Sequence, residues 1–258
     1  MSTATVMPAL EGRGLSPLTL MRVELRKQVD TRGGRGLLLA IGLITVLALG
    51  LVMYLNRTEG ASLDSLLAAT VTPQGLLLPV LGIITACNEW SQRTALVTFT
   101  QEPRRLRVVL AKLLAAVVLG TVAVAGAVLL AMLAHVVSAT IAGAPVHLGL
   151  SAGTLAGIWL SQSIAVVMGV AFGLALLSVP LAITAYFILP TLFTTVSVLW
   201  SKMAELGPWL DMGQASSPLQ EGINLTLRQW SQLGTSSLLW LALPLAVGLW
   251  RVMTREVK

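Results

Sequence analysis

The fold is decided by the run LLAAVVLGTVAVAGAVLLAMLAHVVSAT at residues 113–140, which contains no charged side chain. A helix needs about 20 apolar residues to cross a bilayer core, so this run is long enough. It begins a longer segment, 113–201, in which Lys, Arg, Asp and Glu are all absent. The sequence therefore predicts an all-α integral membrane protein.

The composition of the whole chain points the same way. Hydrophobic residues make up 55% of the 258 residues and charged residues only 11%. Soluble domains carry about 25% charged residues, so this chain lacks the polar side chains to cover a water-soluble globule. Its long uncharged segments do not alternate as the strands of an outer-membrane barrel do.

Loop signals divide the apolar sequence into six predicted spans. The cluster AGAPVH at 142–147 and the shorter SVP at 178–180 break the uncharged segment into three. The span at the C-terminal end is short, and we expect its helix to extend into the residues on either side. The predicted transmembrane domain covers 37–250, with spans near 37–55, 66–87, 108–140, 149–177, 181–200 and 237–250.

Segments outside the spans have their own patterns. Residues 1–14 read as a tail, and from Ser16 apolar residues recur at helical spacing with basic residues on the other faces. This pattern predicts an amphipathic helix on the inner membrane surface, or alternatively an ordinary basic flank, with a bend at 32–36. Tryptophans and prolines at 202–236 predict short helices in the outer interface.

The positive charges orient the chain. Six spans with both termini inside place 14 of the 17 Lys and Arg residues on the cytoplasmic side, leaving Arg57, Lys202 and Arg228 outside. We therefore expect a multi-pass protein of the bacterial cell membrane, with cytoplasmic termini that include 1–36 and 251–258. Because the charges flank apolar spans, the +6 net charge predicts contact with membrane lipid and no nucleic-acid partner.

Sequence signatures of chemistry are missing. There is no G-x-x-x-x-G-K-[ST], no H-E-x-x-H and no G-x-S-x-G, so we expect no catalytic residue, no metal site and no cofactor bound by this chain. The centres of the predicted spans carry no ionisable residue, which argues against a proton-driven carrier. Energy for any transport would then come from outside the chain.

Two sets of small or hydroxylated residues stand out inside the spans. Thr184, Thr191 and Thr195 lie on one side of the fifth predicted span and could face a substrate path; alternatively, they bond carbonyls of the preceding turn. Ala165, Gly169 and Gly173 form a small-xxx-small ladder, which predicts close helix packing within the chain or with a second copy.

The basic stretch NEWSQRTALVTFTQEPRRLRVVLAK at 88–112 separates the second and third predicted spans. Together with RVELRKQ at 22–28, EWSQRT at 89–94 and PRRLRVVLAK at 103–112, it resembles permease subunits of type-2 ABC exporters, particularly the small actinobacterial-type permeases. The resemblance covers nearly the whole chain. Many of those relatives carry an acidic residue followed by Gly-Thr in this loop, where this chain has Arg93-Thr94.

The resemblance implies a function and partners. The 88–112 loop would form a coupling helix on a separate ATPase, present in two copies, which binds ATP and Mg; a second permease copy or homologue would complete the assembly. The implied coupling residues are Glu89, Trp90, Arg93, Thr94, Arg104 and Arg105. The uncharged interior favours an amphiphilic or apolar substrate.

Two other readings stay open. A secondary carrier or channel would transport without an ATPase. A membrane scaffold would recruit a cytoplasmic protein through the 88–112 loop without transporting anything.

Overall fold

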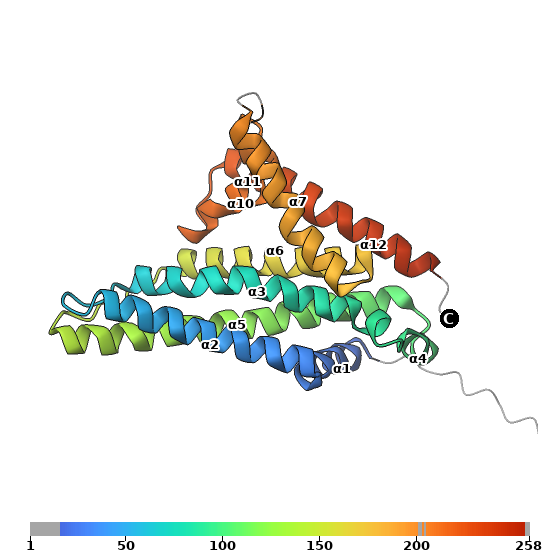
Figure 1. The fold of residues 1–258 in the computed structure, drawn as a ribbon, viewed down its shortest axis with the longest axis horizontal. Coiled ribbons are helices and arrows are strands. Elements are labelled where there is room, and N and C mark those ends of the chain that lie inside the picture. The colour runs from blue at the N-terminus through green and yellow to red at the C-terminus, as the bar shows by residue number, and fades with distance from the viewer. Residues whose placement is uncertain (1–15, 201–202, 204, 256–258) are drawn as a thin grey trace, which may run out of the picture.

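The chain folds as a layered bundle of helices with a second, divergent pair of helices above it (Figure 1). This computed structural model describes residues 16–200, 203 and 205–255, and all the regular structure in these residues is helical. The predicted tail at 1–14, Lys202 and the last three residues lie outside this part of the chain.

Among the described residues, six helical segments are long and apolar enough to cross a membrane, as expected for a multi-pass membrane protein. Each predicted span corresponds to one of them, with shifted ends. The segments are α2 (Arg32–Leu55), α3 (Leu63–Ser91), α5 (Arg105–Ala142), α6 (Ala152–Leu176), α7 (Val179–Leu199) and the composite segment Leu227–Thr254.

The N-terminal amphipathic segment forms α1 (Pro17–Asp30), which starts at a Ser16 cap. The predicted bend at 32–36 is wrong, because α2 already begins at Arg32 and only Thr31 separates the two helices. Thr31 Oγ1 accepts a hydrogen bond from the Gly34 N–H at 3.1 Å and caps α2. A Cβ at Gly34 would lie 1.7 Å from the Gln28 carbonyl oxygen, so only glycine lets the two helices meet so closely.

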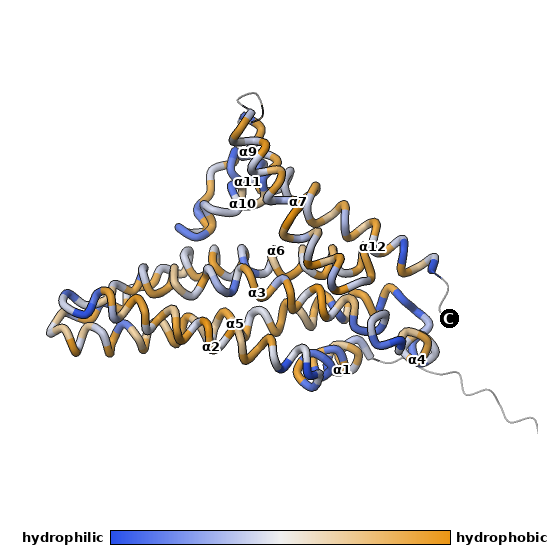
Figure 2. Tube along the Cα trace, viewed as in Figure 1, coloured by the Kyte–Doolittle hydropathy of each residue, from blue (hydrophilic) through white to orange (hydrophobic). Residues whose placement is uncertain are grey.

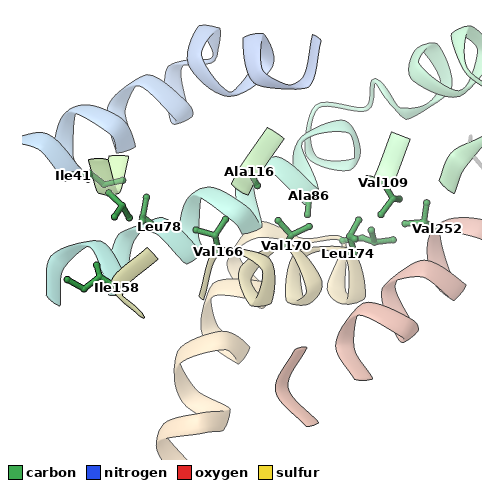
Figure 3. Close-up of a cluster of buried hydrophobic side chains, with 12 residues drawn as sticks. Ile41, Leu78, Ala86, Val109, Ala116, Ile158, Val166, Val170, Leu174 and Val252 are labelled. Carbon is green, nitrogen blue, oxygen red and sulfur yellow. The ribbon is translucent and has the colours of Figure 1, made fainter. Parts of the chain in front are cut away.

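Helix α3 lies at the centre of the bundle and packs against α2, α5 and α6. It continues through Pro73 and Pro79. The main hydrophobic core lies between these helices and α12 (Leu243–Thr254). Figure 3 shows its side chains pointing toward one another along the α3–α6 contact.

The small-residue ladder of α6 faces α3 of the same chain. A Cβ at Gly169 would lie 2.2 Å from the Pro79 carbonyl oxygen, and one at Gly173 would lie 2.6 Å from the Ala86 Cβ. On α3, a Cβ at Gly82 would lie 2.4 Å from the Val166 carbonyl oxygen. The two backbones therefore approach each other through glycines on both helices.

The last span differs from the prediction of 237–250. It is helical from Leu227 to Thr254, as α11 (Leu227–Ser237), a π-helical turn (Leu238–Ala242) and α12 (Leu243–Thr254). A Thr226–Gln229 capping box starts α11 inside the polar region, so the helix begins well before the apolar run. The π-helical turn ends two residues before Pro244, which lacks an N–H to continue the ordinary ladder.

The described part of the connection from α7 to α11 contains short helices, in the upper part of the molecule in Figure 1. They are α9 (Gly207–Leu210), α10 (Met212–Ser216) and the 3-10 turn η1 (Ser217–Gln220). Asp211 caps α10 and also accepts a 2.5 Å hydrogen bond from Thr194 of α7, while Trp240 donates one to the Leu210 carbonyl.

Polar residues concentrate at the ends of the molecule (Figure 2). Helices α1 and α4 (Ala95–Gln101) and the C-terminal end of α12 share one end, here named the α4 end. The loops at 56–62 and 143–151 lie at the opposite end of the bundle (Figure 1).

Candidate functional site

The connection from α3 to α4 is a sharp, hydrogen-bonded turn. The Thr94 N–H donates to the Glu89 carbonyl at 2.9 Å, and the Gln92 N–H donates to the Asn88 carbonyl at the same distance. Arg93 has a φ of 56°, in the left-handed region that glycine favours. The long reach of the Thr94 bond and the left-handed residue before it are typical of a Schellman helix end.

Helix α4 presents a small, mixed surface to solvent at the α4 end. Leu96 and Val97 are 54% and 56% exposed, and Arg93, Thr94 and Arg104, in the turns on either side of α4, are exposed as well. These five residues are named the α4 surface. Exposed apolar residues with arginines at their edge are typical of a protein contact.

Behind this surface lies a buried cluster of four charges. Lys112 Nζ of α5 lies 2.5 Å from Glu89 Oε1 of α3 and 2.6 Å from Glu24 Oε2 of α1. Lys27 Nζ lies 2.7 Å from Glu24 Oε1 and 3.0 Å from Glu89 Oε1. The four residues carry no net charge and join three helices, and they are named the charge cluster.

The charge cluster is satisfied by its own members. Burial alone would lower the pKa of Lys27, but the carboxylates of Glu89 and Glu24 outweigh it and raise that pKa above its usual 10.5. Lys112 also donates to the Thr85 carbonyl at 3.3 Å. Removing one partner from such a buried arrangement costs about 3–5 kcal/mol, because the charge left behind is unpaired.

A second set of contacts joins the start of α5 to the end of α12. Arg105 Nη1 donates to the carbonyls of Val252 at 2.6 Å and Arg255 at 2.8 Å. Its guanidinium also lies over the Phe99 ring of α4, 5.0 Å from the centroid, and that of Arg255 lies 5.1 Å from the Trp90 ring centroid. The four side chains tie α3, α4, α5 and α12 together.

The proline turn between α4 and α5 is also fixed. Glu102 is buried and accepts hydrogen bonds from Arg107 Nη1 at 3.0 Å and from the Arg104 N–H at 3.4 Å. A cavity of about 290 Å³ separates α1 from α4, and it is lined by Glu102 together with Glu24 and Lys27 of the charge cluster.

The six coupling residues suggested by the sequence therefore divide into two groups. Arg93, Thr94 and Arg104 belong to the α4 surface. Glu89 is only 3% exposed and Trp90 is half-buried, while Arg105 points to the end of α12. Glu89 and Arg105 use their polar groups within the chain, and the Trp90 ring lies against the Arg255 guanidinium.

The three threonines predicted to face a substrate path on the fifth span lie in different surroundings. Thr191 lines a cavity of about 440 Å³ between α3, α6, α7 and the α10–η1 segment, whereas Thr184 and Thr195 are exposed on α7. Thr191 and Thr195 both donate to the carbonyl four residues earlier, at 2.6 and 2.8 Å. Among the predicted path residues, Thr191 alone lines this cavity.

Sequence reasoning missed the charge cluster. Its signals were Glu24 and Lys27 three residues apart on one helix, and Lys112 at the entrance of an apolar span. It also missed the amides Gln74 and Gln162, buried inside spans and donating to the Ala123 and Val71 carbonyls on neighbouring helices. In the part of the chain that the structure describes, no three His, Cys, Asp or Glu residues gather as they would around a metal.

No family model and no curated protein matches the chain. The similarity to ABC exporter permeases therefore stays a prediction from the sequence motifs.

Proposed function

We propose that this chain is the membrane-spanning subunit of an ATP-driven exporter, and that a separate ATPase docks on the α4 surface. The observation that carries the proposal is the exposure of Leu96 and Val97 on a short helix at a basic end of the bundle. Apolar side chains on a polar end face water unless a partner covers them. In this proposal the α4 end is cytoplasmic, as its lysines and arginines favour.

The contacts behind the surface support a role in transmitting force. Helix α4 is joined through short turns to α3 and α5, and Glu89 and Lys112 hold these two helices together beneath it. The same cluster includes α1, and Arg105 adds α12. A push on α4 would therefore move several spans as one unit.

The energy source is inferred from the sequence. The chain contains no P-loop motif, so ATP and Mg would be bound and hydrolysed by two copies of the partner subunit. A second copy of this chain, or a homologue, would complete the transmembrane part. The substrate would pass beside the cavity that Thr191 lines.

Reconstitution in proteoliposomes with an ABC ATPase from the same organism tests the proposal. We expect ATP hydrolysis that depends on this chain, and its loss with Leu96→Glu combined with Val97→Glu. Arg104→Glu should weaken it. The matched control is Arg57→Glu, at an exposed arginine next to the opposite end of α2, which should leave hydrolysis unchanged.

The outcomes separate the competing functions. Transport in proteoliposomes without any ATPase would identify a carrier or channel and overturn the proposal. Binding of the ATPase without any effect on its hydrolysis or on transport would identify a scaffold. Full activity of the Leu96→Glu, Val97→Glu double variant would exclude the α4 surface as the docking site.

A further inference from the structure

The cavity of about 440 Å³ that Thr191 lines has a volume in the range of small-molecule sites. Residues of α3, α6 and α7 line it, together with residues of the α10–η1 segment. Close packing holds this segment in place, because the Leu219 carbonyl oxygen lies 2.0 Å from where a Gly157 Cβ would be. All these lining residues come from one copy of the chain.

Gln162 gives this cavity an unused hydrogen-bond acceptor. Its side chain is 97% buried, and its Nε2 donates to the Val71 carbonyl at 2.9 Å. Its Oε1 accepts no hydrogen bond from any residue that the structure describes, although it lines the cavity. This oxygen is therefore free to accept a hydrogen bond from a donor on a ligand in the cavity.

Gly75 leaves the carboxamide accessible. A Cβ at this position would lie 3.8 Å from Gln162 Oε1, at ordinary contact distance, and Gly75 itself lines the cavity. A larger side chain at position 75 would fill the space in front of Gln162 without a clash at its first atom.

The other polar groups on the wall are also mostly acceptors. The hydroxyls of Ser161 and Thr191 already donate to the Ile158 and Phe187 carbonyls, at 2.9 and 2.6 Å, which leaves only their lone pairs for a ligand. Tyr186 lines the cavity as well, and its hydroxyl makes no hydrogen bond within the described chain. None of the lining residues in this part of the chain is charged.

Apolar side chains complete the wall, among them Leu76, Ile164 and Met168. A charged ligand would leave water without a counter-charge here, at a high cost. A ligand with an apolar body and uncharged O–H or N–H donors satisfies both the apolar wall and the free acceptors.

We propose that this cavity binds a neutral amphiphile, and that Gln162 Oε1 accepts a hydrogen bond from its hydroxyl or amide group. If the chain is the exporter subunit proposed above, this ligand class is the class of its substrate. The role of the cavity as a transport site therefore rests on the proposed function. The binding itself requires one copy of the chain and neither ATP nor an ATPase.

The test measures binding of two tritiated probes, 1-lauroylglycerol and N-lauroylethanolamine, to the full-length chain in nanodiscs without an ATPase. We expect saturable binding of at least one, and about tenfold weaker binding of its methylated analogue, which lacks the donors. Laurate, which carries a charge, should not compete. Gln162→Met should weaken binding about three- to tenfold, and Gly75→Leu should abolish it.

Gln74→Met is the matched control. Gln74 is equally buried and also donates to a neighbouring helix, at 3.1 Å to the Ala123 carbonyl, but it does not line the cavity. Its replacement should leave binding unchanged, whatever it does to stability.

Three results would overturn the assignment: no saturable binding of either probe, equal binding of the methylated analogues, or equal losses in Gln162→Met and Gln74→Met. Because no ATPase is present, these results are independent of the docking experiment. Binding as expected with no ATP-driven transport would contradict the exporter and leave the site in place.

Discussion

Lys112 Nζ and Glu89 Oε1 lie 2.5 Å apart and join α5 to α3 directly beneath the helix that connects them. Both side chains are about 95% buried or more. The contact closes the α3–α4–α5 connection into a rigid unit, because α4 is anchored on both sides by helices that are themselves bonded together.

Replacing Lys112 tests this unit. Lys112→Met would leave Glu24 and Glu89 sharing only Lys27, and we expect a loss of about 3–5 kcal/mol in the free energy of unfolding. Lys27→Met should cost less, since the Lys27 side chain is 32% exposed and water can replace part of its interaction. SDS titration in mixed micelles measures both. An equal loss of stability in the two variants would contradict the conclusion that Lys112 is the more deeply buried and more important cation of the charge cluster.

The pKa of Lys27 predicts a pH dependence of stability. Its folded-state pKa is raised, so its contribution is fully present below pH 10.5, its usual unfolded value, and is lost as the pH rises through the higher folded value. Unfolding measured between pH 9 and 12 should therefore show a decline at the alkaline end. The decline should be smaller in Lys27→Met, and an identical pH profile in the two proteins would refute the assignment.

The left-handed backbone at Arg93 predicts that replacing this residue with glycine increases the stability of the protein. A non-glycine residue in the left-handed region costs about 1 kcal/mol, so Arg93→Gly should stabilise the protein by up to that amount. Arg93→Val should destabilise it, because a β-branched side chain tolerates this conformation poorly. Arg22→Gly, inside α1, is the control and should cost about 1 kcal/mol. Thermal unfolding in detergent ranks the three variants.

Arg105 predicts local order at the end of α12. Arg105→Leu removes the hydrogen bonds to the Val252 and Arg255 carbonyls, and hydrogen bonds to charged groups contribute about 1.5–3 kcal/mol. Amide hydrogen exchange at 250–255 should accelerate in this variant. Arg104→Leu, at an exposed neighbour, should not change it. Acceleration in both variants would indicate a general effect on the turn.

The α3–α6 contact predicts opposite results for two sets of glycines. Gly169→Ala and Gly173→Ala should each destabilise the chain by about 1–3 kcal/mol or more, because the added Cβ meets α3 backbone or side-chain atoms within 3 Å. Gly42→Ala and Gly126→Ala meet no atom within 4 Å and should stabilise their helices by up to about 1 kcal/mol. Chemical unfolding measures the change in stability of each variant. Equal changes in all four variants would contradict the close α3–α6 packing.

The backbone conformation of Arg93 is related to the sequence motif in this loop. The resemblance to exporter permeases leads one to expect glycine at this position, and the structure places Arg93 in the backbone conformation that glycine favours. The turn is therefore set by its hydrogen bonds, and arginine occupies it under strain.

The sequence by itself determined the class of protein and the number of spans. Long uncharged runs can avoid water only in a membrane, and Gly-Pro clusters interrupt them at identifiable places, as at 142–147. Helix ends were less certain, because a cap such as Thr226 starts a helix in a polar segment that hydropathy assigns to a loop. The glycine ladder predicted close packing but could not name the partner helix, which is α3.

Only the tertiary structure decided what the charged and amide residues do. Glu24, Glu89 and Lys112 are separated by up to 88 positions, and no local pattern records that they share one buried site. Glu89 looked like a surface contact because it precedes a basic loop, yet the helix turns its carboxylate inward. Charge counts locate a residue relative to the membrane, whereas burial and pairing depend on which helices meet.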